Sequence, residues 1–176
     1  QGSRSCERVA INNCILRTSC AAFKIGTETW HDVRQITMSN CVVHRSNRAV
    51  QIFSKDGAVV EDIAVSNLVV DTDSSITMNR PIHIDLAKRR RGQIEVLRTD
   101  GRILLTAADG GRLEHITLRD ITMHMPWIEN PDDVKDLSDQ MQSSIAVPEA
   151  RLARAALVAA HVDDLQVRNF RVSWPD

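Results

Sequence analysis

The chain has 176 residues, with 22 basic against 23 acidic side chains, so no strong field draws it towards nucleic acid or an anionic membrane. Aromatic residues make up 3% of the chain and tyrosine is absent, which argues against a base-stacking surface; no apolar run has the length of a membrane span. The length suits one domain over residues 1–176.

A ten-residue pattern recurs along the chain and is its most informative feature. It reads ERVAINNCIL at Glu7–Leu16, RQITMSNCVV at Arg34–Val43, EDIAVSNLVV at Glu61–Val70, EHITLRDITM at Glu114–Met123 and DDLQVRNFRV at Asp163–Val172. Aligned on its Asn or Asp, the pattern falls at Asn13, Asn40, Asn67, Asp120 and Asn169, in steps of 27, 27, 53 and 49 residues. We interpret the third step as two periods and the fourth as one period plus an insertion. A period of this size predicts stacked supersecondary units.

Each repeat contains two extended segments. Cys20–Gly26 alternates apolar and polar residues, which predicts a half-buried strand, and the chain then breaks before Arg34–Val43. Within that second segment, Ser39 and Asn40 predict a turn. The next repeat follows the same scheme, with RAVQIF at Arg48–Phe53 and a break at Lys55-Asp56-Gly57.

Short strands separated by turn residues, without a helical period, predict an all-β fold: a single-stranded right-handed parallel β-helix of about six coils of roughly 27 residues. An Asn at each bend suits this fold, because its amide bonds to the Asn above and below. The leucine-rich repeat is the competing architecture, since the spacing of Val33, Ile36, Met38, Cys41 and Val43 fits it. That fold has one strand per repeat, so two segments per repeat favour the β-helix.

Beyond Asn67 the pattern loosens. The segments expected there are a first strand at Arg80–Asp85, a solvated basic loop at Lys88–Gly92, a further coil from Gly101–Thr106 and Leu113–Met123, and a long irregular loop over residues 124–150. Ala150–Ala160 has the composition of a short helix, but its place in the repeat favours a strand at Ala156-Leu157-Val158.

The four cysteines are Cys6, Cys14, Cys20 and Cys41. Cys14 and Cys41 lie one period apart, so we expect them to stack as buried thiols facing inward. A disulfide between them is the less favoured alternative, because stacked strands hold side chains parallel. The spacing matches no metal signature and does not fix the redox compartment.

The repeat register also predicts which residues face outward. If Ile25, Ile52 and Ile84 face the core, the residues beside them face outward. They form rows that cross neighbouring strands, which lie about 4.8 Å apart. We expect one solvent-exposed row of Lys24, Gln51 and His83, a second of Gly26, Phe53 and Asp85, and Glu28 and Lys55 at their edge. Such a mixed patch suits an acidic or hydroxyl-rich sugar chain, although outward residues of this kind are also common on ordinary solvated surfaces.

From this patch we select Asp85 and Glu28 as catalytic candidates, because glycosidases use two carboxylates. The substrate-binding candidates are Lys24, Gln51, His83, Lys55 and Arg48. We expect no cofactor and no metal.

The run CAAFKIGTETWHDVRQITMSNCVVHRSNRAVQIFSKDGAVVEDIAVSNLVV resembles the coil sequence of glycoside hydrolase family 28, the polygalacturonases and their relatives. The matching motifs are an I-G-S/T-E turn, a V-R-N-I-T-x-x-N-C strand, an R-G-x-x-I-x-S-x-x-G coil and a V-E-N-I-x-F-x-N strand. The resemblance implies a right-handed parallel β-helix that cleaves galacturonan-type chains with inversion, using aspartates and no metal. It also implies a secreted or periplasmic protein.

The family's functional motifs match this chain at few positions. Its N-T-D and paired Asp-Asp segments have no counterpart in Gln1–Arg17, and its G-H-G histidine falls at Cys20 or Ala21. Its R-I-K segment falls at Gln51-Ile52-Phe53, and Arg48 matches only the arginine that opens that coil. We therefore expect the chain to be the C-terminal portion of such a protein. Further N-terminal coils or a second subunit would then cover its open end.

The sequence thus predicts a glycoside hydrolase acting on a pectin-type or other acidic polysaccharide. One alternative is a β-helix that binds carbohydrate without cleaving it, or a structural module such as a tailspike-like trimer. Another is a Ca²⁺-dependent polysaccharide lyase on the same fold, which requires an Asp/Glu cluster that the regular repeats do not reveal.

Overall fold

The described residues of the computed structural model are 5–26, 29–73, 80–86, 111–126 and 155–175, and they form an all-β structure. The strands are β1 (Cys6–Asn12), β2 (Ile15–Leu16), β3 (Ala21–Ile25), β4 (Val33–Ser46), β5 (Arg48–Ser54), β6 (Val59–Thr72), β7 (Ile82–Leu86), β8 (Arg112–His124), β9 (Leu157–Ala160) and β10 (Asp163–Ser173). No helix in this described part is long and apolar enough to cross a membrane.

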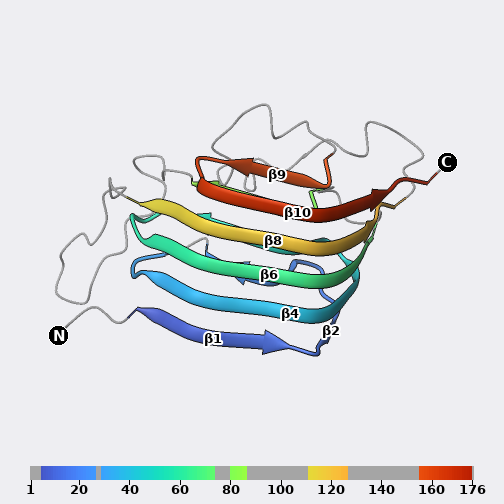
Figure 1. Ribbon diagram of the computed structural model, residues 1–176, viewed down its shortest axis with the longest axis horizontal. Coiled ribbons are helices and arrows are strands. Elements are labelled where there is room, and N and C mark those ends of the chain that lie inside the picture. Colours follow the sequence, from blue (N-terminus) through green and yellow to red (C-terminus); the bar gives the residue numbers. More distant parts are fainter. Residues whose placement is uncertain (1–4, 27–28, 74–79, 87–110, 127–154, 176) are drawn as a thin grey trace.

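The strands form two sheets, and every pairing is parallel. The long sheet has the order β1-β4-β6-β8-β10, with β2 also paired to β4, and the short sheet has the order β3-β5-β7-β9. Figure 1 shows the long sheet stacked from β1 to β10, with the short sheet behind it. The chain alternates between the sheets, so each repeat contributes one strand to each. This confirms two strands per repeat and disagrees with a leucine-rich repeat.

The pairings correct the predicted number of repeats. Ile63 of β6 is directly opposite Ile116 of β8, so these strands are neighbours although the pattern steps by 53 residues between them. The step is therefore one repeat with an insertion, not two periods. The described part has five strands on the main path of the long sheet, against the six coils expected.

The core lies between the two sheets and follows the predicted rows. Ile25, Ile52 and Ile84 of the short sheet are in register and buried. The same core cluster includes a long-sheet row of Met38, Val65 and Leu118, which are fully buried. The predicted strand around Ala156–Val158 is confirmed by β9, because Leu157 pairs with Ile82.

The long sheet contains two rows of left-handed residues at which the chain bends, and β4 has a third bend at Arg45. The first row of positive-φ residues is Arg8, Gln35, Asp62, His115 and Asp164, and the second is Asn13, Asn40, Asn67, Asp120 and Asn169. In β4, the buried positions run 36, 38, 41, 43 and 46, so the alternation slips by one residue at Asn40 and again at Arg45. A left-handed residue thus turns the strand while keeping apolar side chains on the inner face. The expected break at Ser39-Asn40 is this bend inside one continuous strand.

The second row forms an incomplete ladder of side-chain hydrogen bonds. Asn67 Nδ2 donates to Asn40 Oδ1 at 2.6 Å, and Asn169 Nδ2 donates to Asp120 Oδ1 at 2.8 Å. Asp120 lies opposite Asn67, because Ser66 pairs with Arg119 on one side and Leu68 pairs with Ile121 on the other. A carboxylate has no N–H to donate, so it interrupts the ladder.

The thiols behave as expected. Cys41 is buried, Cys14 is half-buried, and each Sγ donates to the carbonyl oxygen two residues earlier, at 3.1 and 3.2 Å. All four cysteines are free, with Cys6 and Cys20 exposed. The predicted basic loop, the segment at Gly101–Thr106 and the loop after residue 126 lie outside the described residues.

Candidate functional site

The short sheet brings together most of the predicted site residues. Lys24 pairs with Gln51, and Gln51 pairs with His83, so the predicted first row is present. In the second row Phe53 pairs with Asp85. These residues are far apart in the sequence and become neighbours because each repeat adds one strand to this sheet. Glu28, the second catalytic candidate, lies outside the described residues.

The expectation that these rows are exposed to solvent is wrong for all but one of the polar side chains. Lys24 is exposed, whereas Gln51 is 4% exposed, and His83 and Asp85 are 0% exposed. Every residue of β5 is buried. Both faces of this strand are therefore covered, and sequence alternation reveals only which residues share a face.

The candidate site contains a buried histidine in a mixed environment. The ring of His83 meets the ring of Phe53 edge-on, with centroids 4.7 Å apart. Its Nε2 lies 3.7 Å from Asp85 Oδ2, too far for a strong hydrogen bond. Burial lowers the pKa of His83, and the positive charges of Arg80 and Arg48 lower it further, while Asp85 acts in the opposite direction. The imidazole is therefore neutral at pH 7.

Asp85 has a second histidine beside it, which the sequence analysis missed. His161 Nδ1 lies 3.6 Å from Asp85 Oδ1, and the His161 side chain is 55% exposed. The strand register could have predicted this contact, because Asp85 pairs with Ala160 and His161 is the next residue. The carboxylate thus lies between a buried imidazole and an exposed one, with both nitrogens beyond hydrogen-bond distance.

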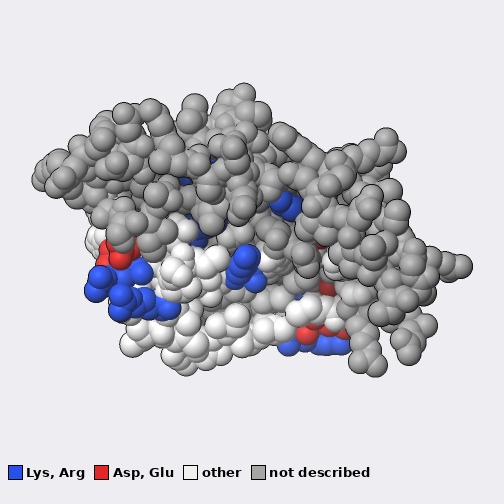
Figure 2. Space-filling view, turned by 180° about the vertical axis from the view of Figure 1, so that it is seen from behind, with Lys and Arg blue, Asp and Glu red and all other residues white. Residues whose placement is uncertain are grey.

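Buried cations lie in and next to the short sheet, and two of them, Arg48 and Arg80, act on the charge of His83. Arg48, predicted as a substrate ligand, is buried and donates from Nη1 to Gln51 Oε1 at 2.9 Å. Lys55 and Arg80 are also buried, at 6% and 2% exposed. Figure 2, which views the molecule from behind the long sheet, shows one basic group near the middle of the described surface and further basic and acidic groups towards both sides.

Hydrogen bonds fix the chain beside Lys55. Asp56 Oδ2 accepts from the backbone N–H of Thr29 at 2.9 Å, and the Thr29 hydroxyl accepts from the backbone N–H of Lys55 at 3.1 Å. Ser54 Oγ lies 3.2 Å from that hydroxyl and donates to the carbonyl of Ala58 at 2.9 Å. The turn after β5 is therefore tied to the chain leaving β3.

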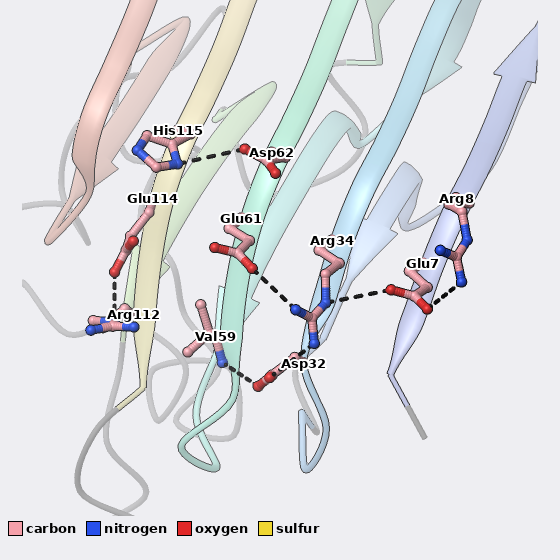
Figure 3. Close-up of polar contacts among 10 residues, drawn as sticks. All are labelled: Glu7, Arg8, Asp32, Arg34, Val59, Glu61, Asp62, Arg112, Glu114 and His115. Atoms are coloured by element: carbon pink, nitrogen blue, oxygen red, sulfur yellow. Dashed lines mark hydrogen bonds and ion pairs between the residues drawn. The ribbon is translucent and has the colours of Figure 1, made fainter. Parts of the chain in front are cut away.

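A charged row crosses the long sheet (Figure 3). Arg34 lies 3.6 Å from carboxylate oxygens of both Glu7 and Glu61, and Arg112 lies 2.5 Å from Glu114. One ligand atom each from Glu61, Glu114 and His115 fall within 4.8 Å of one another, as metal ligands could. The sequence analysis saw no such cluster, although Glu61 and Glu114 occupy the same position of the ten-residue pattern. Both carboxylates already pair with arginines, and His115 lies 3.5 Å from Asp62.

Comparison with known proteins identifies no relative: no family model, no curated protein and no solved structure matches this chain.

Proposed function

We propose that the two sheets are faces of a right-handed parallel β-helix. The support is the alternation of the chain between two all-parallel sheets from β2 onward, with in-register rows across successive repeats. The proposed hand follows the general preference of parallel crossover connections for right-handed paths.

On this scaffold, we propose a glycoside hydrolase that acts on an acidic, pectin-type polysaccharide by inversion. One observation carries the proposal: Arg48 and Arg80 lie close enough to His83 to act on its charge, and Lys24 belongs to the same row as His83, although the whole chain has a net charge of −1. Cations concentrated at one site suit the carboxylates of a uronic acid chain. The resemblance to family 28 coils over Arg17–Val70 supports the same substrate class.

In the proposed reaction, water attacks the anomeric carbon while one carboxyl group takes its proton and another protonates the leaving oxygen. Asp85 is the proposed base, because its contact with His161 leads towards solvent. Glu28 is the proposed acid. Lys24 is the exposed cation that a sugar carboxylate meets first, and Arg48 positions Gln51. No metal or cofactor takes part in this scheme.

We further propose a secreted or periplasmic location, as the family resemblance implies.

The edge strands β1 and β3 border an apolar hollow of about 720 Å³, lined by Phe23, Ile25 and Ile36 among others. Further coils or a second subunit are the proposed cover for this end, because open strand edges and apolar surface favour association.

Two variants test the hydrolase proposal. Asp85→Asn keeps the shape of the side chain, so we expect release of reducing ends from polygalacturonate to cease while binding persists. We expect Lys24→Ala to weaken binding to polygalacturonate several-fold, measured by calorimetry, while Arg171→Ala, a matched exposed cation on the long sheet, leaves it unchanged. Circular dichroism checks the fold of each variant. Unchanged turnover in Asp85→Asn and unchanged affinity in Lys24→Ala would refute the site.

The second candidate function is a module that binds acidic polysaccharide without cleaving it. The burial of His83 and Asp85 favours it, because binding through the exposed Lys24 requires no contact between the sugar chain and these buried groups. It predicts the same loss of affinity in Lys24→Ala, but no reducing ends from the unaltered protein. Turnover by the unaltered protein therefore distinguishes the two functions.

A further inference from the structure

The outer face of the long sheet carries a groove of about 390 Å³ that is lined mostly by polar residues. Apart from Val65, its lining comes from two in-register rows that cross β4, β6, β8 and β10: Thr37, Ala64, Thr117 and Gln166 in one, and Ser39, Ser66, Arg119 and Arg168 in the other. The groove lies between the two rows of positive-φ residues that bend each strand. It belongs to the opposite sheet from the proposed catalytic site.

Two arginines stand side by side at one end of this groove. Arg119 pairs directly with Arg168, whereas the same row holds Ser39 and Ser66 in the two preceding strands. Like charges directly opposite each other in a sheet are destabilising.

Neighbouring groups in the described part of the chain compensate this charge weakly. Arg119 Nε lies 4.0 Å from Asp120 Oδ2, with both side chains at least half exposed. Arg168 Nη2 donates to the neutral Gln166 Oε1 at 3.0 Å. The nearest further carboxylate in this network is Asp164, which accepts from Gln166 Nε2 at 3.4 Å. An anion placed between the two guanidinium groups would relieve their repulsion.

We propose that this groove binds an acidic oligosaccharide, with a carboxylate or sulfate group held between Arg119 and Arg168. The guanidinium fork can donate two parallel hydrogen bonds to two oxygens of a carboxylate or sulfate group. The hydroxyls of Ser39, Ser66 and Thr117 line the path away from the arginines and suit the hydroxyls of a sugar chain. The four strands span about 14 Å at an interstrand spacing of about 4.8 Å, which accommodates a ligand of a few sugar units.

Nitrogen-15 NMR of the arginine Nε–Hε groups tests this site. We expect trigalacturonate to shift the Arg119 and Arg168 signals saturably, and inorganic sulfate to shift the same signals more weakly because it cannot use the hydroxyl rows. Sulfate acting as strongly as trigalacturonate would contradict a role for those rows. Maltotriose, which has no acid group, should leave the signals in place.

Two variants copy residues from the same row. Arg119→Ser and Arg168→Ser install the residue found in β4 and β6, so each should fold, and each should weaken trigalacturonate binding about tenfold. Arg171→Ser, on the same strand but outside the groove, should bind as the unaltered protein does. Because the repulsion is relieved, the melting temperature of either groove variant without ligand should not fall.

Equal affinity in both groove variants and the unaltered protein would overturn the proposal. So would linear shifts of equal size at Arg119, Arg168 and Arg171, which would indicate an adventitious ion only. Lys24→Ala separates this site from the one on the short sheet, because it should leave the Arg119 and Arg168 shifts unchanged. Loss of those shifts in Lys24→Ala would contradict a separate groove.

Discussion

Asp120 interrupts the amide ladder of the long sheet, so Asp120→Asn should join its two parts from Asn40 to Asn169. The new amide would donate to Asn67 Oδ1, in the same direction as the bonds from Asn67 to Asn40 and from Asn169 to Asp120. The left-handed φ of 54° at this position is one that Asn tolerates well.

The expected gain is small because the ladder is exposed. One added neutral hydrogen bond contributes about 0.5–1 kcal/mol. Two losses offset part of this gain. The bond from Asn169 would no longer go to a charged acceptor, and the 4.0 Å ion pair between Asp120 and Arg119 would be lost, although an exposed pair of this kind contributes little. The net gain is about 0.5 kcal/mol, which corresponds to roughly 1–2 °C in melting temperature for a domain of this size.

Urea denaturation and calorimetry measure this change, with Asn67→Asp as the opposite perturbation. That variant removes the donor to Asn40 and places two carboxylates side by side, so it should cost about 1–2 kcal/mol. If Asp120→Asn were less stable than the unaltered protein, or if Asn67→Asp were neutral, the ladder would not contribute to stability as described.

Two further predictions concern the short sheet and its surroundings. Gly26→Ala should lower the free energy of unfolding by about 2 kcal/mol or more, because its φ is +86° and the new Cβ would overlap the carbonyl oxygen of Phe53. Gly111→Ala, whose Cβ would approach no atom closer than 3.2 Å, is the matched control in the same denaturation assay, and equal losses would contradict the argument. Because burial lowers the pKa of His83, the unfolded chain binds the proton more readily than the folded chain, so stability should fall as pH drops below about 6.5, by at most about 1.4 kcal/mol per pH unit. His83→Gln, which copies Gln51 of the preceding strand, should remove this contribution between pH 7.5 and 5.5, and an unchanged slope would argue against it.

The rows of the short sheet were predictable because successive repeats keep the same spacing. Ile25 precedes Asn40 by the same number of residues as Ile52 precedes Asn67, so aligning the Asn residues also aligned Lys24 with Gln51. The number of repeats was not predictable in this way. A 53-residue step fits either two periods or one period with a long insertion, and only the pairing of β6 with β8 distinguishes them.

Burial and backbone bends were the other features that the sequence did not reveal. Alternation assigned His83 and Asp85 to the outer face correctly, but it carries no information on whether that face is covered. Gln35 adopts a left-handed φ of 56° although glutamine has no particular preference for it, because its place in the bend determines its backbone. The pairing of Glu61 with Glu114, by contrast, was available from the sequence, because both residues occupy the first position of the ten-residue pattern.

The central claim is that the short-sheet cluster around Asp85 hydrolyses an acidic polysaccharide. A proton NMR time course of oligogalacturonate with the purified chain tests it most directly, because it identifies the product and its anomeric form. The account predicts new reducing ends of inverted configuration, which are absent with Asp85→Asn. An unsaturated product, or no product at all, would contradict it.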